Sequence, residues 1–341
     1  MKKALSLIII ALIAFGLLTA CGKNGPANDP ADTTPAGEIT LDKDLEIRVS
    51  VLSGTTGMGI APLIKSANEG KEPLNYKFEI QSDATLIAPG IIGNTVDIAA
   101  VPTNLAATLY NKTNGGIQLL AANTKGVLYI VSKDSTVDSI DDLKGKTVHV
   151  PGAGTNPEYL LKYVLTAAGL EIGKDVTLDY TYQSPDALTA ALISASDVSF
   201  ALLPEPKVSA AKAKDADLKS VIDLTAEWNK VSEGYDLYQG CIIVRKAFLE
   251  AHPNEVAEFL RAYKASIESV VADPDAASEI IAEVGIIPNA GLAKKAIPSC
   301  NLCYDDSQKM KDSVLELFKI LHGIEPTSIG GKIPDADIFK K

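Results

Sequence analysis

The chain has 341 residues, 46% of them hydrophobic and 22% charged, so it is long enough for two ordinary domains and can bury their cores. Its formal net charge of −11 excludes a general electrostatic grip on nucleic acid, which needs a basic face. Only three residues are arginines (Arg48, Arg245 and Arg261), so a cluster of arginines that clamps a phosphate is excluded. With only 3 histidines as well, we expect no nucleic-acid partner, no metal and no other cofactor.

Residues 1–20 have the pattern of a secretory signal peptide. Lys2 and Lys3 precede an apolar run, Ala4–Leu18, that is shorter than the roughly 20 residues of a membrane-spanning helix. An uncleaved membrane anchor is the alternative. The following junction, LTACG, resembles the bacterial lipobox, whose cysteine is acylated and becomes the first residue of the mature protein. The resemblance implies that Cys21 carries the lipid, including palmitate.

Residues 21–44 are rich in proline, glycine, asparagine and aspartate and show no apolar periodicity. Such a composition predicts a flexible tether. The folded part then begins near Leu45. We expect it to be extracytoplasmic and anchored by lipid to the cell membrane.

From residue 45 onward, strand patterns alternate with helix patterns. The tail after residue 253 is expected to be largely helical. Strands are expected at 45–52, 76–82, 96–102, 117–123, 126–132, 147–151, 176–182, 198–204, 220–224 and 241–248. Helices are expected at 61–67, 103–112, 158–168, 185–195, 254–272, 277–284 and 306–321.

This alternation favours an α/β fold with parallel, doubly wound sheets. The elements form two similar series, and the chain returns to the first one near residue 240. We therefore predict two lobes: lobe one is 45–128 plus 240–341, and lobe two is 129–239. Two crossings, near 126–131 and 238–244, would form a two-strand hinge. Because ligands sit beyond the carboxyl ends of strands in open α/β sheets, the lobes should share a cleft.

Several segments together resemble one family, and they occur in the same order from about residue 45 to residue 322. They include GMGIAPLI, IIGNTVDIAAVPTNLAA, SIDDLKGKTVHVPGAGTNPEYLLKYVLTAAGL, PDALTAALISASDVSFALLPEP and CIIVRKAFLEAHPNEVAEFLRAYKASIE. The family is the nitrate/taurine/alkanesulfonate-type substrate-binding proteins of ABC importers, a group that also includes binders of thiamine-pyrimidine precursors. The resemblance implies a two-lobed, type II periplasmic-binding-protein (Venus flytrap) fold. It also implies a monomer that delivers a small molecule to a permease and its ATPase, and no catalytic activity.

Three glycine- or hydroxyl-rich loops follow predicted strands: Ser53–Gly59, Pro102–Asn104 and Gly152–Asn156. Their free N–H groups and hydroxyls could hold a polar ligand, although each could also be a tight turn that binds nothing. The GAG in the third loop does not continue as a dinucleotide fingerprint, because Pro157 stands at the third glycine position. The resemblance implies ligand-binding roles for one set of residues in these loops: Thr55, Thr56, Gly57, Thr103, Asn104, Gly154, Thr155 and Asn156. Ser53 is included because it opens the first loop.

Glu205, between Pro204 and Pro206, follows a predicted strand. Its carboxylate could bind an ammonium or ring N–H group of a ligand, or it could be a solvated acid in a loop. Weaker candidates for the cleft are Asp83, Tyr238 and Gln239, together with three aromatic side chains that could stack on a ring: Tyr129, Tyr182 and Trp228.

Cys241, Cys300 and Cys303 remain if Cys21 is lipidated, and an odd number leaves at least one thiol free. A disulfide between Cys241 and Cys300, or between Cys300 and Cys303, and a fully reduced protein all stay open. His149 lies in a predicted strand and is expected in the core. The sequence contains no G-x-S-x-G motif, so a hydrolase has no recognisable nucleophile.

These observations favour a solute-binding protein that closes on a compact organic anion or zwitterion, because the loops offer amides and hydroxyls. A heteroaromatic vitamin precursor of the thiamine-pyrimidine type is the second choice of ligand. A surface enzyme on the same fold and a sensory lipoprotein are the alternatives from other classes.

Overall fold

The computed structural model describes residues 40–194 and 197–340, which from Thr40 onward form one compact unit. The predicted signal peptide, Cys21 and most of the predicted tether lie outside the described residues. Within the described ranges, no helix combines the length and the apolar character needed to cross a membrane.

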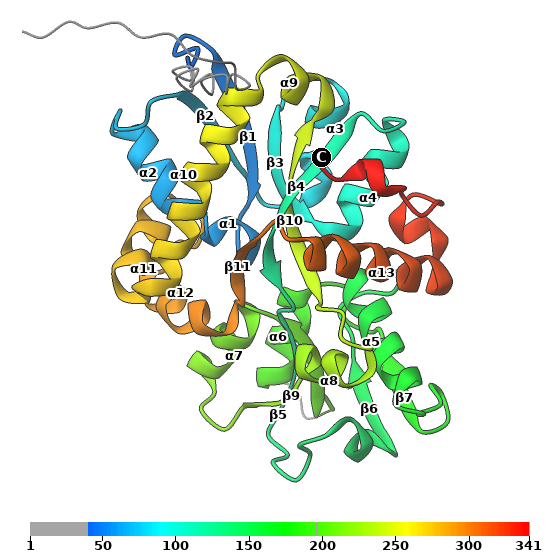
Figure 1. Ribbon diagram of the computed structural model, residues 1–341. Helices are drawn as coiled ribbons and strands as arrows, with labels where there is room; N and C mark the ends of the chain where they lie inside the picture. Colours follow the sequence, from blue (N-terminus) through cyan, green and yellow to red (C-terminus); the bar gives the residue numbers. More distant parts are fainter. Residues whose placement is uncertain (1–39, 195–196, 341) are drawn as a thin grey trace, which may run out of the picture. The chain divides into compact units, whose positions relative to one another are not determined.

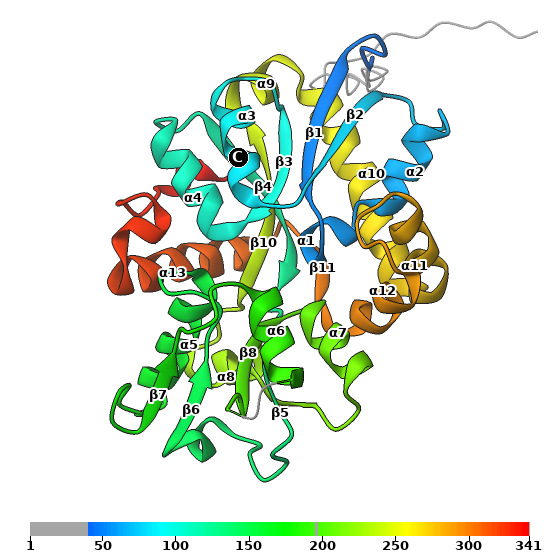
Figure 2. The same cartoon turned by 180° about the vertical axis from the view of Figure 1, so that it is seen from behind.

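Six strands form the first sheet, in the order β2-β1-β3-β10-β4-β11. Their bounds are β1 Glu46–Leu52, β2 Asn75–Gln81, β3 Ile98–Pro102, β4 Ile117–Lys125, β10 Tyr238–Arg245 and β11 Leu302–Asp305. One face of this sheet is covered by α1, α2, α10, α11 and α12, and the other by α3, α4 and α13 (Figures 1 and 2). The short helix α9 follows β10.

The bounds of these helices are α1 Thr55–Met58, α2 Ala61–Asn68, α3 Ala88–Ile92, α4 Thr103–Lys112, α9 Lys246–Ala251, α10 Pro253–Ala272, α11 Pro274–Glu283, α12 Ala290–Ala296 and α13 Gln308–Ile324. Short 3₁₀ turns accompany them: η1 Ala84–Leu86, η3 Ile297–Ser299, η4 Pro326–Ile329 and η5 Ala336–Ile338.

Five strands form the second sheet, in the order β7-β6-β8-β5-β9. Their bounds are β5 Leu128–Ser132, β6 Lys146–His149, β7 Val176–Asp179, β8 Phe200–Pro204 and β9 Lys219–Asp223. Helices α5 (Asn156–Ala167) and α8 (Leu224–Val231) pack on one face, and α6 (Pro185–Ser194) and α7 (Lys207–Lys214) on the other. The turn η2 (Ile140–Leu143) precedes β6.

The two sheets follow the same plan. In each, three neighbouring strands are parallel and the fourth position holds a reversed strand, β10 in the first sheet and β5 in the second. The expectation of wholly parallel sheets is therefore wrong at these positions. The physical reason is the route of the chain, because β5 and β10 are the strands by which it crosses between sheets and each enters from the other sheet's side. The predicted two-lobed α/β fold is confirmed.

The crossings lie between β4 and β5 and just before β10. They are joined to each other, since the Val127 N–H donates to the Gln239 side-chain oxygen at 2.7 Å. The return strand β10 is also fixed to β1 through a buried carboxylate. Asp97 is 1% exposed and accepts hydrogen bonds from Arg48 and Arg245. Burial alone would raise the pKa of Asp97, but these hydrogen bonds outweigh it and lower that pKa.

The helical tail contains a helix, α12, and a strand, β11, that the sequence patterns did not predict. Strand β11 extends the first sheet beside β4, and it places Cys303 at the sheet edge. Within the described residues the three cysteines are free thiols, with Cys241 and Cys300 buried. No disulfide joins either of the pairs considered from the sequence.

Candidate functional site

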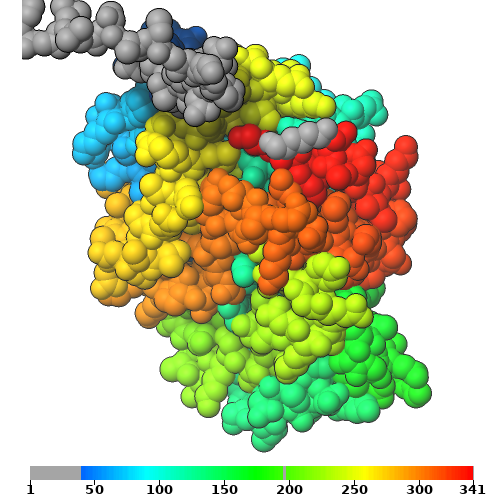
Figure 3. Space-filling model, in the orientation of Figure 1, coloured from blue at the N-terminus to red at the C-terminus, as the bar shows by residue number. Residues whose placement is uncertain are grey.

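The predicted ligand loops lie where the two sheets meet. Strands β1, β3, β6 and β8 all end at this junction, and α1, α4, α5 and α7 begin there. On the face shown in Figure 3, the orange residues around α13 lie directly against the yellow-green segment that precedes β10. Here the Asp236 N–H donates to the Ser313 hydroxyl at 3.1 Å. The lobes therefore touch each other along the junction.

Thr55 and Glu205, which are 150 residues apart, are in direct contact. The Thr55 hydroxyl donates to the Glu205 carbonyl oxygen at 2.9 Å and lies 3.8 Å from the Cys300 sulfur. Thr55 is 8% exposed, and α1, to which it belongs, has no capping side chain at its start. One predicted residue from each lobe is thus brought together.

The Glu205 side chain is 5% exposed. Its two carboxylate oxygens accept hydrogen bonds from the Ser209 N–H and the Ser209 hydroxyl, both at 3.1 Å, in the first turn of α7. Burial raises the pKa of Glu205, and these hydrogen bonds offset that rise only in part. Among the described residues, no cation lies within ion-pair distance of Glu205, and Lys212 acts on it only from further away. Glu205 is therefore a buried acid that lacks a charge partner.

The rest of the first loop is held mainly by its own backbone. A Cβ atom on Gly57 would lie 2.0 Å from the Leu52 carbonyl oxygen, so only glycine fits this turn. The Thr56 carbonyl accepts from the Asn123 side chain at 3.1 Å, and the Ser53 side chain is exposed. Gly57 thus has a structural reason to be glycine that is independent of any ligand.

The second loop starts α4. Thr103 is 1% exposed and lies beside the Cys241 thiol, whose pKa is raised to about 12 by burial. The Asn104 side-chain N–H donates to the Ser328 carbonyl at 3.4 Å, while its side-chain oxygen is buried without a hydrogen-bond partner. This loop therefore faces η4, a segment that was not among the sequence candidates.

In the third loop the protein itself uses two of the expected polar groups. The Gly154 N–H donates to the Glu158 carboxylate, and the Thr155 hydroxyl donates to the Gly152 carbonyl at 3.0 Å. Asn156 keeps a buried side-chain oxygen that has no partner. Of the two polar side chains in this loop, that of Asn156 is therefore the one left for a ligand.

Glu158 is 4% exposed and fixes the shape of this loop. Besides the Gly154 N–H, its carboxylate accepts from the Tyr180 hydroxyl at 2.9 Å and pairs with Lys162. Burial would raise the pKa of Glu158, but these partners outweigh it and lower that pKa.

Three of the weaker candidates, Asp83, Trp228 and Tyr129, make contacts within the protein. Asp83 caps η1, where it accepts from the Thr85 N–H at 2.7 Å. The Trp228 ring is fully buried against Tyr163, and its N–H donates to the Tyr235 carbonyl. Tyr129, 8% exposed, crosses between the lobes, because its hydroxyl donates to the Ser299 carbonyl at 2.9 Å. Trp228 therefore offers no free ring face at the junction, and the Tyr129 hydroxyl is already occupied.

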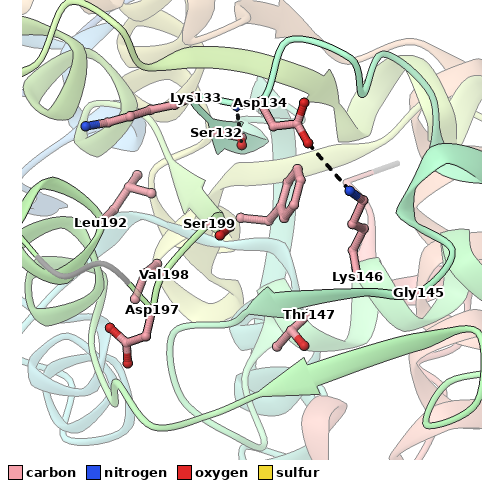
Figure 4. A pocket seen from close by; sticks show the side chains of 11 residues that line it. Ser132, Lys133, Asp134, Gly145, Lys146, Thr147, Leu192, Asp197, Val198 and Ser199 are labelled. Carbon is pink, nitrogen blue, oxygen red and sulfur yellow. Dashed lines mark hydrogen bonds and ion pairs between the residues drawn. The ribbon is translucent and has the colours of Figure 1, made fainter.

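A separate hollow of about 560 Å³ opens at the far end of the second sheet, away from the junction (Figure 4). It lies beside Ser132 and Phe200, which pair at the opposite ends of β5 and β8 from Leu128 and Pro204. Lys146 lies 3.5 Å from Asp134 and stands over the Phe200 ring. Its charge is therefore already paired. Elsewhere, among the described residues, no group of three or more His, Cys, Asp or Glu side chains is arranged to hold a metal ion.

The fold and the paired loops define a class, the two-lobed substrate-binding proteins of ABC importers. The chain is similar to an ABC transporter from Parabacteroides distasonis, with 27% identity and a TM-score of 0.74 over 88% of this chain and 99% of that one. It has the fold of the aliphatic sulphonate-binding protein SsuA of Escherichia coli, with 13% identity and a TM-score of 0.68 over 87% of this chain and 92% of that one.

Two sequence matches add to this likeness. Residues 117–277 match the family described as NMT1/THI5 like. The riboflavin-binding protein RibY of Chloroflexus aurantiacus is 22% identical over 309 residues, which are 84% of this chain and 80% of that protein. The chain thus has the two-lobed fold of ABC-type substrate-binding proteins, and its likenesses include sulfonate binders of that kind.

Proposed function

We propose that this protein is the lipid-anchored, extracytoplasmic receptor of an ABC importer. It binds one compact organic anion or zwitterion between its lobes and delivers it unchanged to a permease that is driven by its ATPase. The observation that carries the proposal is the contact between Thr55 and Glu205, because two loops at strand ends of different sheets meet there. A ligand that touches both loops would shift the protein towards its closed state.

Glu205 favours the zwitterion within this class. A buried carboxylate without a cationic partner is costly, and an ammonium group of a ligand would remove that cost. The Thr56 hydroxyl is next in the chain to Thr55, which contacts Glu205, and would be a hydrogen-bond donor for the acid end of the ligand. A ligand with an ammonium group and an acid group close together is a compact zwitterion.

A flavin is the competing ligand, because one relative is a riboflavin-binding protein. Stacking on a flavin ring needs exposed aromatic faces. Trp228 is fully buried, and the Tyr129 hydroxyl is engaged with Ser299. The burial of Trp228 weighs against a flavin, whereas Tyr182 keeps a partly exposed ring that could stack on one.

Native mass spectrometry of the protein purified from the cells that make it tests the proposal. We expect one bound small molecule with an acid group, recovered chemically unchanged after incubation. A calorimetric panel of taurine, isethionate, propane-1-sulfonate and riboflavin then compares a zwitterion, two anions and a flavin. A converted molecule would indicate an enzyme, and binding of riboflavin alone would contradict the proposed ligand class.

The membrane anchor has its own test. Cys21→Ala removes the residue whose acylation the lipobox predicts. We expect this variant in the soluble extracytoplasmic fraction and the parent protein in the membrane fraction. If both partition into the membrane, the lipid anchor is wrong, while the binding function is unaffected.

A further inference from the structure

Three polar side chains at one end of the junction carry a buried oxygen atom without a hydrogen-bond partner. They are Asn104 in α4, Asn156 in α5 and Ser328 in η4, here called the Ser328 cluster. In folded proteins most buried polar atoms are paired, and each exception calls for a missing partner. Three such atoms on neighbouring elements indicate that a partner for this cluster is absent from the described chain.

The cluster draws on both lobes. In lobe one, η4 is fastened to α4, because the Asn104 side chain donates to the Ser328 carbonyl and the Asn111 side chain donates to the Ile329 carbonyl at 2.8 Å. In lobe two, α5 packs against α13, the helix that leads into η4. Tyr159, one turn after Asn156, is close enough to Glu325 for that charge to help raise its pKa, after the larger effect of burial. Asn156 and η4 therefore approach each other across the junction.

The electrostatic surroundings of the cluster disfavour a charged group. Glu325, whose side chain caps η4, is a negative charge beside the cluster and would repel an acid. Helices α4 and α5 have 10 and 12 residues, and both begin here without a capping side chain. Their positive dipole ends would repel an ammonium group. An uncharged group that makes several hydrogen bonds fits both constraints.

We infer that the Ser328 cluster binds an uncharged hydroxyl or amide arm of the transported molecule. This inference rests on the proposed function and narrows it, because it makes the substrate a compact zwitterion with a neutral polar arm. Ser328 becomes a specificity-determining residue, since its hydroxyl distinguishes a polar arm from an apolar one of the same size.

The first test uses ligand-free protein and therefore needs no knowledge of the substrate. Removing a buried hydroxyl that has no partner relieves an unfavourable burial, so Ser328→Ala should leave the melting temperature unchanged or raise it. The matched control is Ser266→Ala, because the Ser266 hydroxyl donates to the Gly59 carbonyl at 2.8 Å and accepts from the Leu63 N–H at 3.1 Å. That control should lower the melting temperature. An equal loss in both variants would overturn the inference.

The second test uses L-homoserine and L-norvaline, two zwitterions of similar shape whose arms end in a hydroxyl and a methyl group. Wild-type protein should bind homoserine more tightly. Ser328→Ala should weaken homoserine binding by about 2- to 13-fold, the value of one neutral hydrogen bond, and leave norvaline binding unchanged.

Equal affinities for the two compounds, or no binding of either, would overturn the inference about the arm. The proposed function would fail in a different way, through the absence of any bound molecule in protein taken from its own cells. The two failures are therefore distinguishable.

Discussion

The two ends of the lobe junction differ in the kind of interaction partner that their buried groups lack. At the Thr55 end, the neighbouring groups have hydrogen-bond partners, but the buried Glu205 carboxylate has no charge partner. At the Ser328 end, the reverse holds, since uncharged side chains have buried oxygens without hydrogen bonds. One end therefore calls for a cationic group and the other for a neutral polar group. The groups that each end leaves without a partner thus indicate which groups a ligand spanning the junction would carry.

Glu205→Gln is expected to have the largest effect on ligand binding at the Thr55 end. The variant keeps the size and hydrogen-bonding capacity of the side chain and removes its charge. We expect it to weaken L-homoserine binding by roughly 10- to 150-fold, the range for a hydrogen bond to a charged group. Calorimetric titration measures the effect. The control is Glu255→Gln, because Glu255 lies in lobe one, is similarly buried and accepts from the Asp42 N–H. If both variants bind like the parent protein, the Thr55 end does not need a cationic partner.

The pH dependence of stability also tests whether the Glu205 carboxylate is buried without a charge partner. Because the pKa of Glu205 is raised in the folded protein, the folded state binds more protons than the unfolded state between the ordinary value of 4.5 and the raised one. The contribution of Glu205 to the free energy of unfolding is therefore fully present below pH 4.5. It is lost as the pH rises through the raised pKa of Glu205. Thermal melts of ligand-free protein across this window should show this loss in the parent and its absence in Glu205→Gln. Parallel profiles would contradict the pKa direction.

Thr55→Val tests whether the Thr55 end holds the lobes together. Valine has a similar shape but cannot donate to the Glu205 carbonyl. We expect a loss of about 0.5–1.5 kcal/mol in the free energy of unfolding. Small-angle scattering of the ligand-free variant should give a larger radius of gyration, because the direct bond between the lobes is gone. A stable variant with an unchanged scattering profile would show that this bond does not hold the lobes closed.

Tyr129→Phe is expected to have the smallest effect. It removes the hydrogen bond between the Tyr129 hydroxyl and the Ser299 carbonyl, which is only partly buried, so water can replace it. The free energy of unfolding should fall by about 0.5 kcal/mol, measured by chemical denaturation. A loss as large as that of Thr55→Val would mean that the lobes are held equally at both contacts.

The sequence predicted the fold because alternating strand and helix patterns and the return near residue 240 are visible without contacts. It also predicted that the loops after the strands would meet, since loops at the carboxyl ends of strands gather at one edge of a sheet. Thr55 and Glu205 do meet there, and their role in ligand binding stays a prediction. The reversal of β5 and β10 was missed, because strand periodicity is the same in both directions.

Ser328 could not be found from the sequence. It lies in a short 3₁₀ turn after α13, and its place beside α4 depends on the Asn104 and Asn111 side chains more than 200 residues earlier. Thr155 is the opposite case, a residue that the sequence suggested for ligand binding although its hydroxyl is used within the protein. Its position after a strand favoured ligand binding, but its hydroxyl donates to the Gly152 carbonyl, a local bond that the residue pattern cannot distinguish.

One zwitterion with a polar arm is proposed to span both ends of the junction. A crystal structure of the protein grown with L-homoserine tests it most directly. We expect density for one molecule between the lobes, with its ammonium group at the Glu205 carboxylate and its hydroxyl at Ser328. Homoserine bound elsewhere, for example in the hollow beside Lys146, or a junction without density at saturating homoserine, would contradict it.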